Sequence, residues 1–404
     1  MRRIFAITAL LAVMTITALS ARGEQGDSIP SKVVPSPSPT KGWYETLRLR
    51  GYAQLRYNGL FETNPNLACD QCDKSWGGEG GGFFFRRIRL VFFGQIHERV
   101  YLYIQPDFAS GGSNLAQIRD AYFDLALDAK QEFRLRIGQS KVPFGFENMQ
   151  SSQNRLPLDR HDGMNSAVPN EREAGVFFYY APKEIRDRFR YLVSSGLKGS
   201  GDYGMFGFGL YNGQGPNAQD RNKSVHVVSR MTYPFLMKSG QIIEASFQGY
   251  SGKYIVRPSA AIDAGQNEFK DYRYGPSLII YPQPFGLQAE YNWGVGPEYD
   301  PESGKVVEAP LGGGYILANY QIKAGERLII PFTRYHYYKG GKKFEADATK
   351  HRVKEFEIGV EWQPHKNFEL VTMYTISDRT FEDSSNPNNR QKGSLLRLQA
   401  QVNF

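Results

Sequence analysis

The sequence predicts an all-β fold, an antiparallel transmembrane β-barrel, from three observations. Apolar and polar residues alternate along many short segments, as they do along a strand with two different faces. The chain is 14% aromatic and contains 42 glycines, yet its mean hydropathy is −0.48. Beyond the N-terminus no run of 18 apolar residues occurs, which excludes a bundle of membrane-spanning helices. A barrel with a wet lumen and an apolar outer face fits all three observations.

The first 42 residues precede the strand pattern. Arg2 and Arg3, the apolar residues 4–19 and the small residues of 18–23 are typical of a secretory signal peptide over residues 1–23. An anchoring helix is the alternative, which its modest length and small-residue exit disfavour. Residues 24–42 are rich in proline and serine, which predicts an extended linker.

The charge of the chain gives little support to nucleic acid binding. Loss of the three arginines of residues 1–23 would lower the formal charge from +8 to +5. Such a mild excess, behind an export signal, indicates no nucleic acid partner.

Only two cysteines occur, Cys69 and Cys72. Outside the cytoplasm such a near pair usually oxidises, so we expect a small disulfide within a loop. A redox site or half of a metal site is the alternative. No second CxxC, no nearby histidine pair and no thioredoxin-like pattern accompanies it.

Strand-like alternation begins near Trp43 and continues to Phe404, in a predicted barrel of residues 43–404, with no helix-length period. Connections alternate between tight turns and long polar loops, as in outer-membrane barrels. The seventeen segments are 47–58, 87–96, 98–108, 118–128, 133–137, 174–180, 191–197, 205–211, 224–233, 241–250, 272–281, 285–295, 314–322, 326–338, 353–362, 368–378 and 395–404.

An antiparallel single-chain barrel with both ends on one side needs an even number of strands. The alternation of turns and loops fails between residues 171 and 204, where the segments flanking 181–190 are interpreted as one interrupted strand. We therefore expect 16 strands, with 18 as the alternative. Aromatic residues at strand ends are expected to form the two membrane-interface girdles; they are Trp43, Tyr57, Tyr233, Tyr250, Tyr281, Tyr337 and Trp362.

The last segment, Leu395–Phe404, alternates strictly and ends on an aromatic residue at the free carboxylate. It resembles the C-terminal strand of bacterial outer-membrane proteins, which the outer-membrane assembly machinery reads. A half-buried strand of a soluble sandwich is the alternative. This resemblance implies a location in the bacterial outer membrane, in contact with its lipid.

The predicted inner face is rich in arginine. Arginines that face a pore favour anions, since the protein walls strengthen the Coulomb attraction. The guanidinium fork also matches oxyanions such as phosphate. The inward arginines expected from the alternation are Arg48, Arg50, Arg56, Arg87, Arg89, Arg134, Arg136, Arg230 and Arg334.

Acidic residues fall on the same face and give these arginines a second interpretation. The lumens of barrels carry both signs of charge, and acids that pair with the arginines would leave a pore without selectivity. The inward acids are Asp107, Asp120, Asp124, Glu244, Glu290, Glu355, Glu357 and Glu361.

Several motifs resemble the phosphate-selective porin O and P family, and the resemblance runs from about Gly51 to Phe404. In their order along the chain, and with this C-terminus, they are fairly specific. They are Phe85–Leu90, Ile118–Tyr122, Leu135–Gly145, Leu210–Gly215 and Arg334–Tyr335. Ser140 and Val142 depart from the GQFKEPF sequence that is usual in the family.

The resemblance implies a 16-stranded porin, a homotrimer that passes small anions such as phosphate. In the family the third long loop folds inward and narrows the channel. By position this loop is residues 140–171, with Lys141, Arg155 and Arg160 as candidate anion-binding residues. The motifs do not match the lysines of the family's mouth and central filter, so phosphate selectivity does not follow from them. No cofactor or metal is implied.

Two other classes of function are weaker. A barrel enzyme would need a nucleophile and a base, but the six histidines lie outside any GxSxG or HExxH frame. A structural or receptor barrel would need a plug domain or an interaction motif before Trp43, where only the short linker stands. A passive, anion-preferring channel remains the leading interpretation, with a general non-selective porin as the runner-up.

Overall fold

The computed structural model describes residues 42–67, 82–108, 116–257, 259, 261–262 and 266–404. The predicted signal peptide, nearly all of the predicted linker and the predicted disulfide between Cys69 and Cys72 lie outside these residues.

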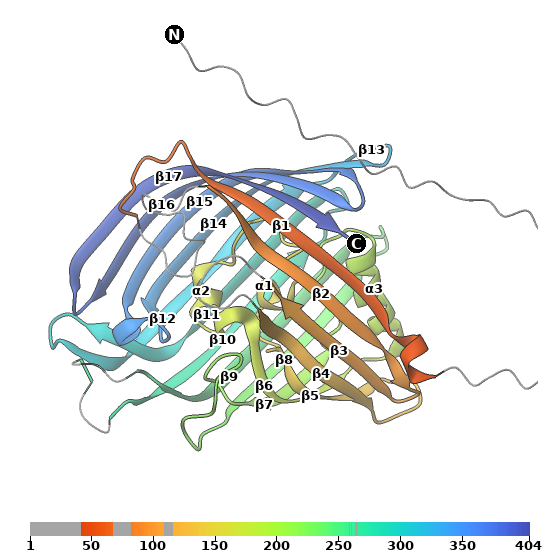
Figure 1. The fold of residues 1–404 in the computed structure, drawn as a ribbon, viewed down its shortest axis with the longest axis horizontal. Helices are drawn as coiled ribbons and strands as arrows, with labels where there is room; N and C mark the ends of the chain where they lie inside the picture. Colours follow the sequence, from red (N-terminus) through yellow and green to blue (C-terminus); the bar gives the residue numbers. More distant parts are fainter. Residues whose placement is uncertain (1–41, 68–81, 109–115, 258, 260, 263–265) are drawn as a thin grey trace, which may run out of the picture. The chain divides into compact units, whose positions relative to one another are not determined.

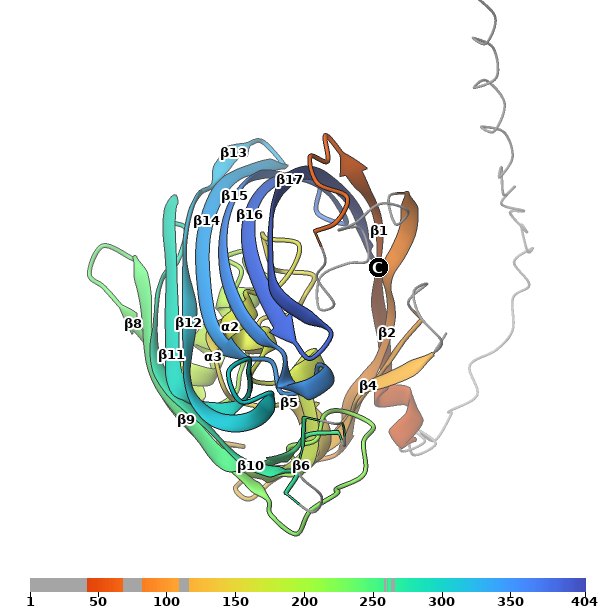
Figure 2. The same cartoon turned by 90° about the vertical axis from the view of Figure 1, so that its left-hand side faces the viewer.

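The described residues from Gly42 to Phe404 form one closed antiparallel barrel (Figures 1 and 2). The strands are β1 (Arg48–Leu60), β2 (Phe83–His97), β3 (Val100–Asp107), β4 (Gln117–Ala126), β5 (Phe133–Lys141), β6 (Arg172–Tyr180), β7 (Phe206–Tyr211), β8 (His226–Leu236), β9 (Ile242–Ile255), β10 (Glu268–Ile280), β11 (Phe285–Asp300), β12 (Lys305–Tyr320), β13 (Ile322–Ala324), β14 (Arg327–Gly341), β15 (Lys350–His365), β16 (Phe368–Asp383) and β17 (Asn386–Asn403).

Each strand pairs with its neighbours in sequence, and the barrel closes where β1 pairs with β17. At this seam Tyr52 lies opposite Asn403 and Tyr57 lies opposite Leu398. The three-residue β13 extends β12 along the same partner, β14. The described segments therefore make a wall of 16 strands, which confirms the predicted number.

Short helices complete the described elements. They are the α-helices α1 (Phe146–Met149), α2 (Asp162–Asn165) and α3 (Lys183–Ser194), and the 3-10 helices η1 (Trp43–Thr46), η3 (Pro169–Glu171) and η4 (Ala346–Ala348). None of these described helices has the length and apolar character needed to cross a bilayer.

The wall has an apolar outer face and a polar inner face, as the alternation predicts. On β15, Phe356, Ile358 and Trp362 are exposed on the outside, whereas Glu357 and Glu361 between them are buried inside. An exposed aromatic or branched side chain suits lipid, and an inward carboxylate needs water or a partner.

The two ends of the barrel differ, and we call them the turn end and the loop end. The turn end carries the tight connections and the C-terminus, where Phe404 exchanges backbone hydrogen bonds with Gly51. The loop end carries the connections that follow β1, β3, β5, β7, β9, β11, β14 and β16, of which those after β11 and β16 are short, residues 301–304 and 384–385. Short turns on one side and long loops on the other are typical of outer-membrane barrels.

One connection at the turn end is long and corrects the strand prediction. Residues 191–197, expected to be part of an interrupted strand, form the end of helix α3 and the turn after it. Ile185, Phe189 and Leu192 are the buried residues of this helix. Their spacing of four and three residues is a helical period, so the pattern was present but short.

The girdle prediction is wrong at two positions. Tyr233 and Trp362 are exposed on the wall and Trp43 is exposed in η1, but Tyr250 and Tyr281 are almost fully buried inside. Tyr250 follows the inward parity of Glu244 and Gln248 along β9, and the Tyr281 hydroxyl donates to Glu244 at 2.6 Å. Position at a strand end does not settle which side of the wall a tyrosine faces.

Candidate functional site

The connection between β5 and β6 crosses the inside of the barrel. We call it loop L3 and define it as residues 142–171, which include α1, α2 and η3. Figures 1 and 2 show α2 surrounded by the strands of the wall, and Figure 1 shows α1 beside it. Most side chains of L3 are buried, although a loop at a barrel rim would normally face water.

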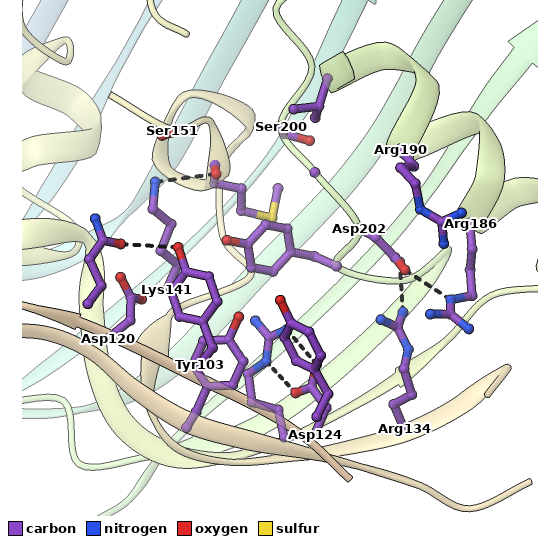
Figure 3. Close-up of a pocket in the computed structure, with 18 of the residues that line it drawn as sticks. Tyr103, Asp120, Asp124, Arg134, Lys141, Ser151, Arg186, Arg190, Ser200 and Asp202 are labelled. Carbon is purple, nitrogen blue, oxygen red and sulfur yellow. Dashed lines mark hydrogen bonds and ion pairs between the residues drawn. The ribbon is translucent and has the colours of Figure 1, made fainter. Parts of the chain in front are cut away.

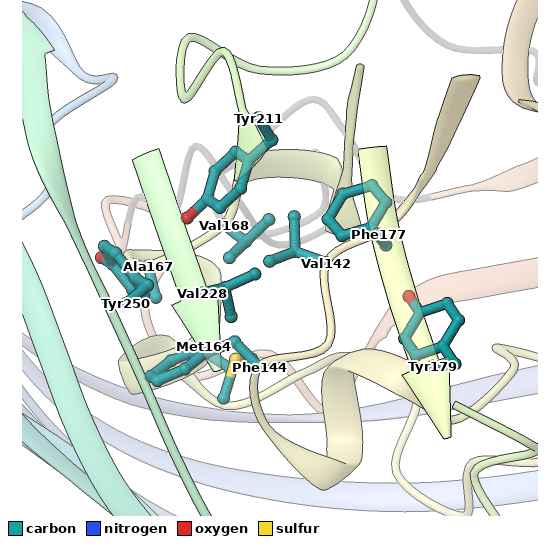
Figure 4. Close-up of a cluster of buried hydrophobic side chains, with 10 residues drawn as sticks. All are labelled: Val142, Phe144, Met164, Ala167, Val168, Phe177, Tyr179, Tyr211, Val228 and Tyr250. Atoms are coloured by element: carbon teal, nitrogen blue, oxygen red, sulfur yellow. The ribbon is translucent and has the colours of Figure 1, made fainter. Parts of the chain in front are cut away.

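Apolar packing holds L3 against two parts of the inner wall. Figure 4 shows Val142, Phe144, Met164, Ala167 and Val168 packed on inward residues of β6 to β9. Farther along the loop, Leu156 and Leu158 pack on inward residues of β12, β14 and β16. Each fully buried side chain of this size stabilises the loop by about 1.5–3 kcal/mol, so L3 is a fixed part of the lumen.

Carboxylates of L3 form ion pairs with the wall on its far side. Asp159 pairs with Arg56 of β1, at 3.2 Å, and with Arg397 of β17. Glu147 pairs with Arg334 of β14 at 2.6 Å. The loop therefore spans the lumen from β5 to the seam of the barrel.

These contacts set the charge state of the loop. Burial alone would raise the pKa of Glu147, but the charge of Arg334 and the hydrogen bond with His161 lower it to about 2. The pKa of Asp159 is also lowered, because Arg56 and Arg397 outweigh its burial. Both groups are carboxylates at neutral pH and neutralise part of the arginine face.

Helix α3 narrows the turn end of the lumen. Its buried residues Ile185, Phe189 and Leu192 pack with Phe146 of L3 and with Ile279 of the inner wall. Figure 1 shows the helix at the end of the barrel that also carries the C-terminus. L3 and α3 together occupy much of the lumen beside β6 to β17.

A cavity of about 490 Å³ lies between L3, α3 and the inner faces of β1 to β6 (Figure 3). Eight basic and three acidic side chains line it. The acids are Asp120, Asp124 and Asp202, and the bases are Arg50, Arg99, Arg134, Arg136, Lys141, Arg172, Arg186 and Arg190.

The three acids do not neutralise this lining. Asp202 is shared by Arg134, at 2.7 Å, and Arg186, at 3.0 Å (Figure 3). Asp124 accepts two hydrogen bonds from the Arg136 guanidinium, at 2.7 and 2.9 Å. The pKa of Asp202 is lowered, since the charges of the two arginines outweigh its burial.

Two cavity arginines keep their charge uncompensated. Among the described residues Arg50 and Arg99 form no ion pair, and both side chains are exposed. Arg50 stacks over the ring of Phe93, with its guanidinium carbon 5.2 Å from the ring centre. A guanidinium that is fixed by a ring and faces water attracts anions.

Beside the cavity, four basic residues converge on Glu171, the last residue of L3. Lys141 lies 3.5 Å, Arg155 3.2 Å and Arg160 3.5 Å from its oxygens, and Arg172 also contacts it. Burial would raise the pKa of Glu171, but these four charges lower it well below its usual range. Arg172 also pairs with Asp120 at 3.0 Å. The cluster retains a net positive charge.

The structure places eleven of the twelve predicted basic residues in two groups, and Arg48 belongs to neither. Arg48 lies exposed at the start of β1, and Arg50, Arg134, Arg136 and Lys141 line the cavity. The others are buried on the inner wall or in L3, and nearly all have an acidic partner; they are Arg56, Arg87, Arg89, Arg155, Arg160, Arg230 and Arg334.

Arg87 is the exception in the second group. It forms no ion pair with any described residue; its Nη1 donates to Gln54 at 2.8 Å and its Nε has no partner. The charges that act on it most strongly are those of Arg86, Arg89 and Arg155. A buried guanidinium is repelled by the guanidinium groups around it. An approaching anion relieves this repulsion and is therefore attracted to the site.

One group of side chains has the spacing of a metal site. One side-chain oxygen or nitrogen atom from each of Asp162, His336 and Glu355 lies within 4.8 Å of the other two. However, Arg379 lies 2.9 Å from Asp162 and 2.7 Å from Glu355, and Lys342 lies 2.6 Å from Asp162. Two cations already compensate these carboxylates, so the group fits an anchor for L3 better than a cation site.

Comparison with known proteins agrees with this architecture. The model of the family described as phosphate-selective porin O and P matches residues 70–404. The chain belongs to this porin family. A search of curated protein sequences finds no significant match. As a member of a porin family, the protein is an outer-membrane channel and not an enzyme, as the sequence predicts.

Solved porin structures share the fold of this porin at low sequence identity. An anion-selective porin from Comamonas acidovorans is 10% identical, with a TM-score of 0.53 over 89% of this chain and 99% of that one. The OmpF porin of Salmonella typhi, in complex with daunomycin, is 15% identical, with a TM-score of 0.53 over 89% and 97%. A loop-deletion mutant of Vibrio cholerae OmpT is 10% identical, with a TM-score of 0.50 over 89% and 99%.

Four basic residues that line the cavity of this porin were not predicted from the sequence. Arg99 lies in the turn between β2 and β3, Arg172 begins β6, and Arg186 and Arg190 lie on α3. The spacing of four residues between Arg186 and Arg190 places both on one face of a helix. Recognition of the helical period in residues 183–194 would have found these two.

Proposed function

We propose that this porin is a passive channel that prefers anions. The observation that carries the proposal is the lining of the cavity, with eight basic side chains against three acidic ones. Low-dielectric walls around a narrow water path strengthen such an excess of positive charge. An arginine that is paired with an acid has its charge compensated, so the unpaired Arg50 and Arg99 are expected to contribute most to the anion preference.

Phosphate and similar oxyanions are the substrates that the cavity chemistry favours within this class. Arginine donates two parallel hydrogen bonds to one oxyanion, and seven of the eight basic residues are arginines. The family description supports the same substrate. We also expect the channel to assemble as a homotrimer, as the resemblance to the family implies.

Planar-bilayer recording of the refolded protein across a KCl gradient tests the anion preference. The proposal predicts a reversal potential that corresponds to higher permeability for chloride than for potassium. A permeability ratio at or below one would show that the inner acids neutralise the arginines and that the protein is a general porin.

Phosphate titrated into the same recording tests the substrate. An oxyanion site would reduce the chloride current at phosphate concentrations far below that of chloride, since phosphate would occupy the path longer. Sulfate and acetate at equal concentration serve as controls for oxyanion charge and geometry. A chloride current that is unchanged by phosphate would contradict the oxyanion site. It would not bear on the anion preference, which the reversal potential tests separately.

A further inference from the structure

The outer wall carries a cluster of basic residues at the loop end of β14 to β17. We call it the rim patch and define it as Lys339, Arg352, Lys354, Arg390 and Lys392. All five are exposed, and each has the parity of the outward, lipid-facing residues of its strand. The patch is therefore outside the lumen and separate from the cavity.

Strand pairing places the patch at one level of the wall. Lys339 lies opposite Arg352, and Arg352 lies opposite Thr380, which lies opposite Arg390. One step closer to the turn end, Lys354 lies opposite Asp378, which in turn faces Lys392 across the next pair of strands. The basic residues therefore form two adjacent rows that run across four strands.

The level below these rows is apolar. Phe356 and Ile376 lie opposite each other as the next outward residues towards the turn end, and both are exposed. Tyr335, opposite Phe356 on β14, continues this row. Basic side chains that begin where exposed apolar side chains end mark the border between acyl chains and lipid headgroups.

The rim patch has an excess of positive charge. Asp378 is the acidic residue within the rows, 2.7 Å from Arg390 and 3.6 Å from Lys392. Among the described residues Arg352 and Lys354 form no ion pair. A third row, closer to the loop end, is balanced, since Lys350 lies opposite Glu382.

The adjoining part of the wall, β9 to β12, has no such excess at the same border. On β9 to β12 the outward charges form pairs, Lys253 with Glu268 at 3.1 Å and Lys270 with Glu308 at 3.3 Å. The excess on β14 to β17 is therefore a local feature and not a general property of the rim.

The rim patch is also hollowed. A cavity of about 100 Å³ is lined by Arg352, Lys354, Asp378, Thr380 and Arg390. Three cations and a hydroxyl outnumber the Asp378 carboxylate, which Arg390 already compensates, and provide donors on several sides of one tetrahedral oxyanion. Such a hollow distinguishes the patch from a row of separate, fully solvated lysines.

We propose that the rim patch binds the phosphate groups of a phosphorylated lipid of the outer leaflet, with the acyl chains of that lipid on the apolar residues below. The position of the patch at this border indicates a lipid as the bound molecule, because the phosphate of a lipid headgroup lies where the apolar face ends. A free anion would gain nothing from Phe356 and Ile376, and a second copy of this chain would bring the same positive charge.

The test compares two lipids that differ in one phosphate. Diphosphoryl lipid A and monophosphoryl lipid A are added to the detergent-solubilised barrel, and bound lipid is counted by native mass spectrometry. The patch variant carries Arg352→Gln, Lys354→Gln, Arg390→Gln and Lys392→Gln. The control variant, Lys253→Gln with Lys270→Gln, removes charge at the same border on β9 and β10, where the charges are balanced.

The wild type and the control variant are expected to bind the diphosphoryl lipid at least tenfold more tightly than the patch variant. This is a modest expectation, since one basic residue near an anionic surface contributes about fivefold. Single-channel conductance verifies that each variant is a folded barrel, because the substituted residues lie outside the lumen.

Four results would overturn the proposal. The first is equal binding of the two lipids by the wild type, and the second is equal loss in the patch and control variants. The third is displacement of the lipid by millimolar inorganic phosphate, which would assign the hollow to a free anion. A change of oligomeric mass in the patch variant without lipid would instead assign the face to contact between copies.

Discussion

At the scale of single residues, the basic side chains of the lumen differ by whether an acid compensates them. Arg136 is held by Asp124 and lies over Tyr122, with its guanidinium carbon 3.9 Å from the ring centre. Arg50 and Arg99 have no such acid among the described residues. A compensated arginine shapes the lumen, whereas an uncompensated one contributes its charge to the field that a permeating ion meets.

Neutralising the two uncompensated arginines should reduce the anion preference. Arg50→Gln with Arg99→Gln removes two charges from the cavity without leaving a buried acid unpaired. One charge at 4 Å in water contributes about 1 kcal/mol, so the chloride-to-potassium permeability ratio should fall by up to about fivefold per residue. Arg327→Gln, an exposed arginine on the outer face at the turn end, should leave the ratio unchanged. Equal ratios in wild type and the double variant would contradict this assignment.

Removing an L3 carboxylate should destabilise the loop. Asp159→Asn leaves Arg56 and Arg397 buried without their shared partner. Breaking a buried ion pair from one side typically costs about 3–5 kcal/mol. Thermal unfolding followed by circular dichroism should show a lower midpoint than the wild type. Asp187→Asn, on the exposed face of α3, should leave the midpoint unchanged, and an unchanged midpoint in Asp159→Asn would contradict the anchoring role.

Strand alternation predicts which face of the wall a residue lies on, but it does not predict the partner of that residue. Arg89 and Asp107 were both expected to point inward, and they lie 2.8 Å apart. Asp159 and Arg397 are far apart in the sequence, and no periodicity relates them. Acids pair with many of the arginines of the wall, whereas Arg50 and Arg99 of the cavity lining have no acidic partner among the described residues. That difference depends on side chains of L3 and α3 that strand alternation does not describe.

At the scale of elements, L3 and α3 decide how much of the lumen stays open. Both are fixed by apolar clusters that share the wall of β6 to β16, and Phe146 of L3 belongs to the cluster of α3. The strands were predictable because a period of two persists over many residues. Helix α3 was not recognised, because its three buried residues, Ile185, Phe189 and Leu192, stand inside a short, strongly charged segment.

Loosening α3 should widen the turn end of the channel. Phe189→Ala deletes an almost fully buried ring, and such deletions typically cost about 3–5 kcal/mol. We expect a larger single-channel conductance, or frequent transitions to a larger level, as the helix leaves the wall. Tyr191→Ala, on the exposed side of the same helix, is the matched control and should conduct like the wild type. Identical conductance in the two variants would show that α3 does not limit the current.

Acid should loosen L3. The pKa of Glu147 is about 2, against an ordinary value of 4.5, so folding favours its ionised form. Its stabilising contribution, about 3 kcal/mol, is complete above pH 4.5 and is lost as the pH falls towards 2. The thermal midpoint of the wild type should therefore drop between pH 7 and pH 3. Glu147→Gln should show a smaller drop, and a larger or equal drop would contradict the role of this carboxylate.

At the scale of the whole barrel, two surfaces carry separate excesses of positive charge. The cavity lies inside, between L3, α3 and β1 to β6, and the rim patch lies outside on β14 to β17. The alternation of strand residues keeps them apart, because neighbouring residues on one strand face opposite sides of the wall. Substitutions on one surface are therefore expected to leave the other unchanged.

The central claim is that the water path runs through a positively charged cavity. Modification of one introduced cysteine tests the path and its sign together. Ser151→Cys places a thiol of L3 in the cavity (Figure 3), with Cys69 and Cys72 replaced by serine. Negatively and positively charged methanethiosulfonate reagents of similar size are then applied during recording. Ser239→Cys, exposed in the turn between β8 and β9, gives the intrinsic ratio of the two reaction rates.

The account predicts that modification of the Ser151→Cys thiol changes the current. It also predicts that the negative reagent reacts faster than the positive one, by several-fold relative to Ser239→Cys. A thiol that the positive reagent modifies equally fast, or whose modification leaves the current unchanged, would contradict it. Equal rates would mean a cavity without net charge, and an unchanged current would mean that ions take another path.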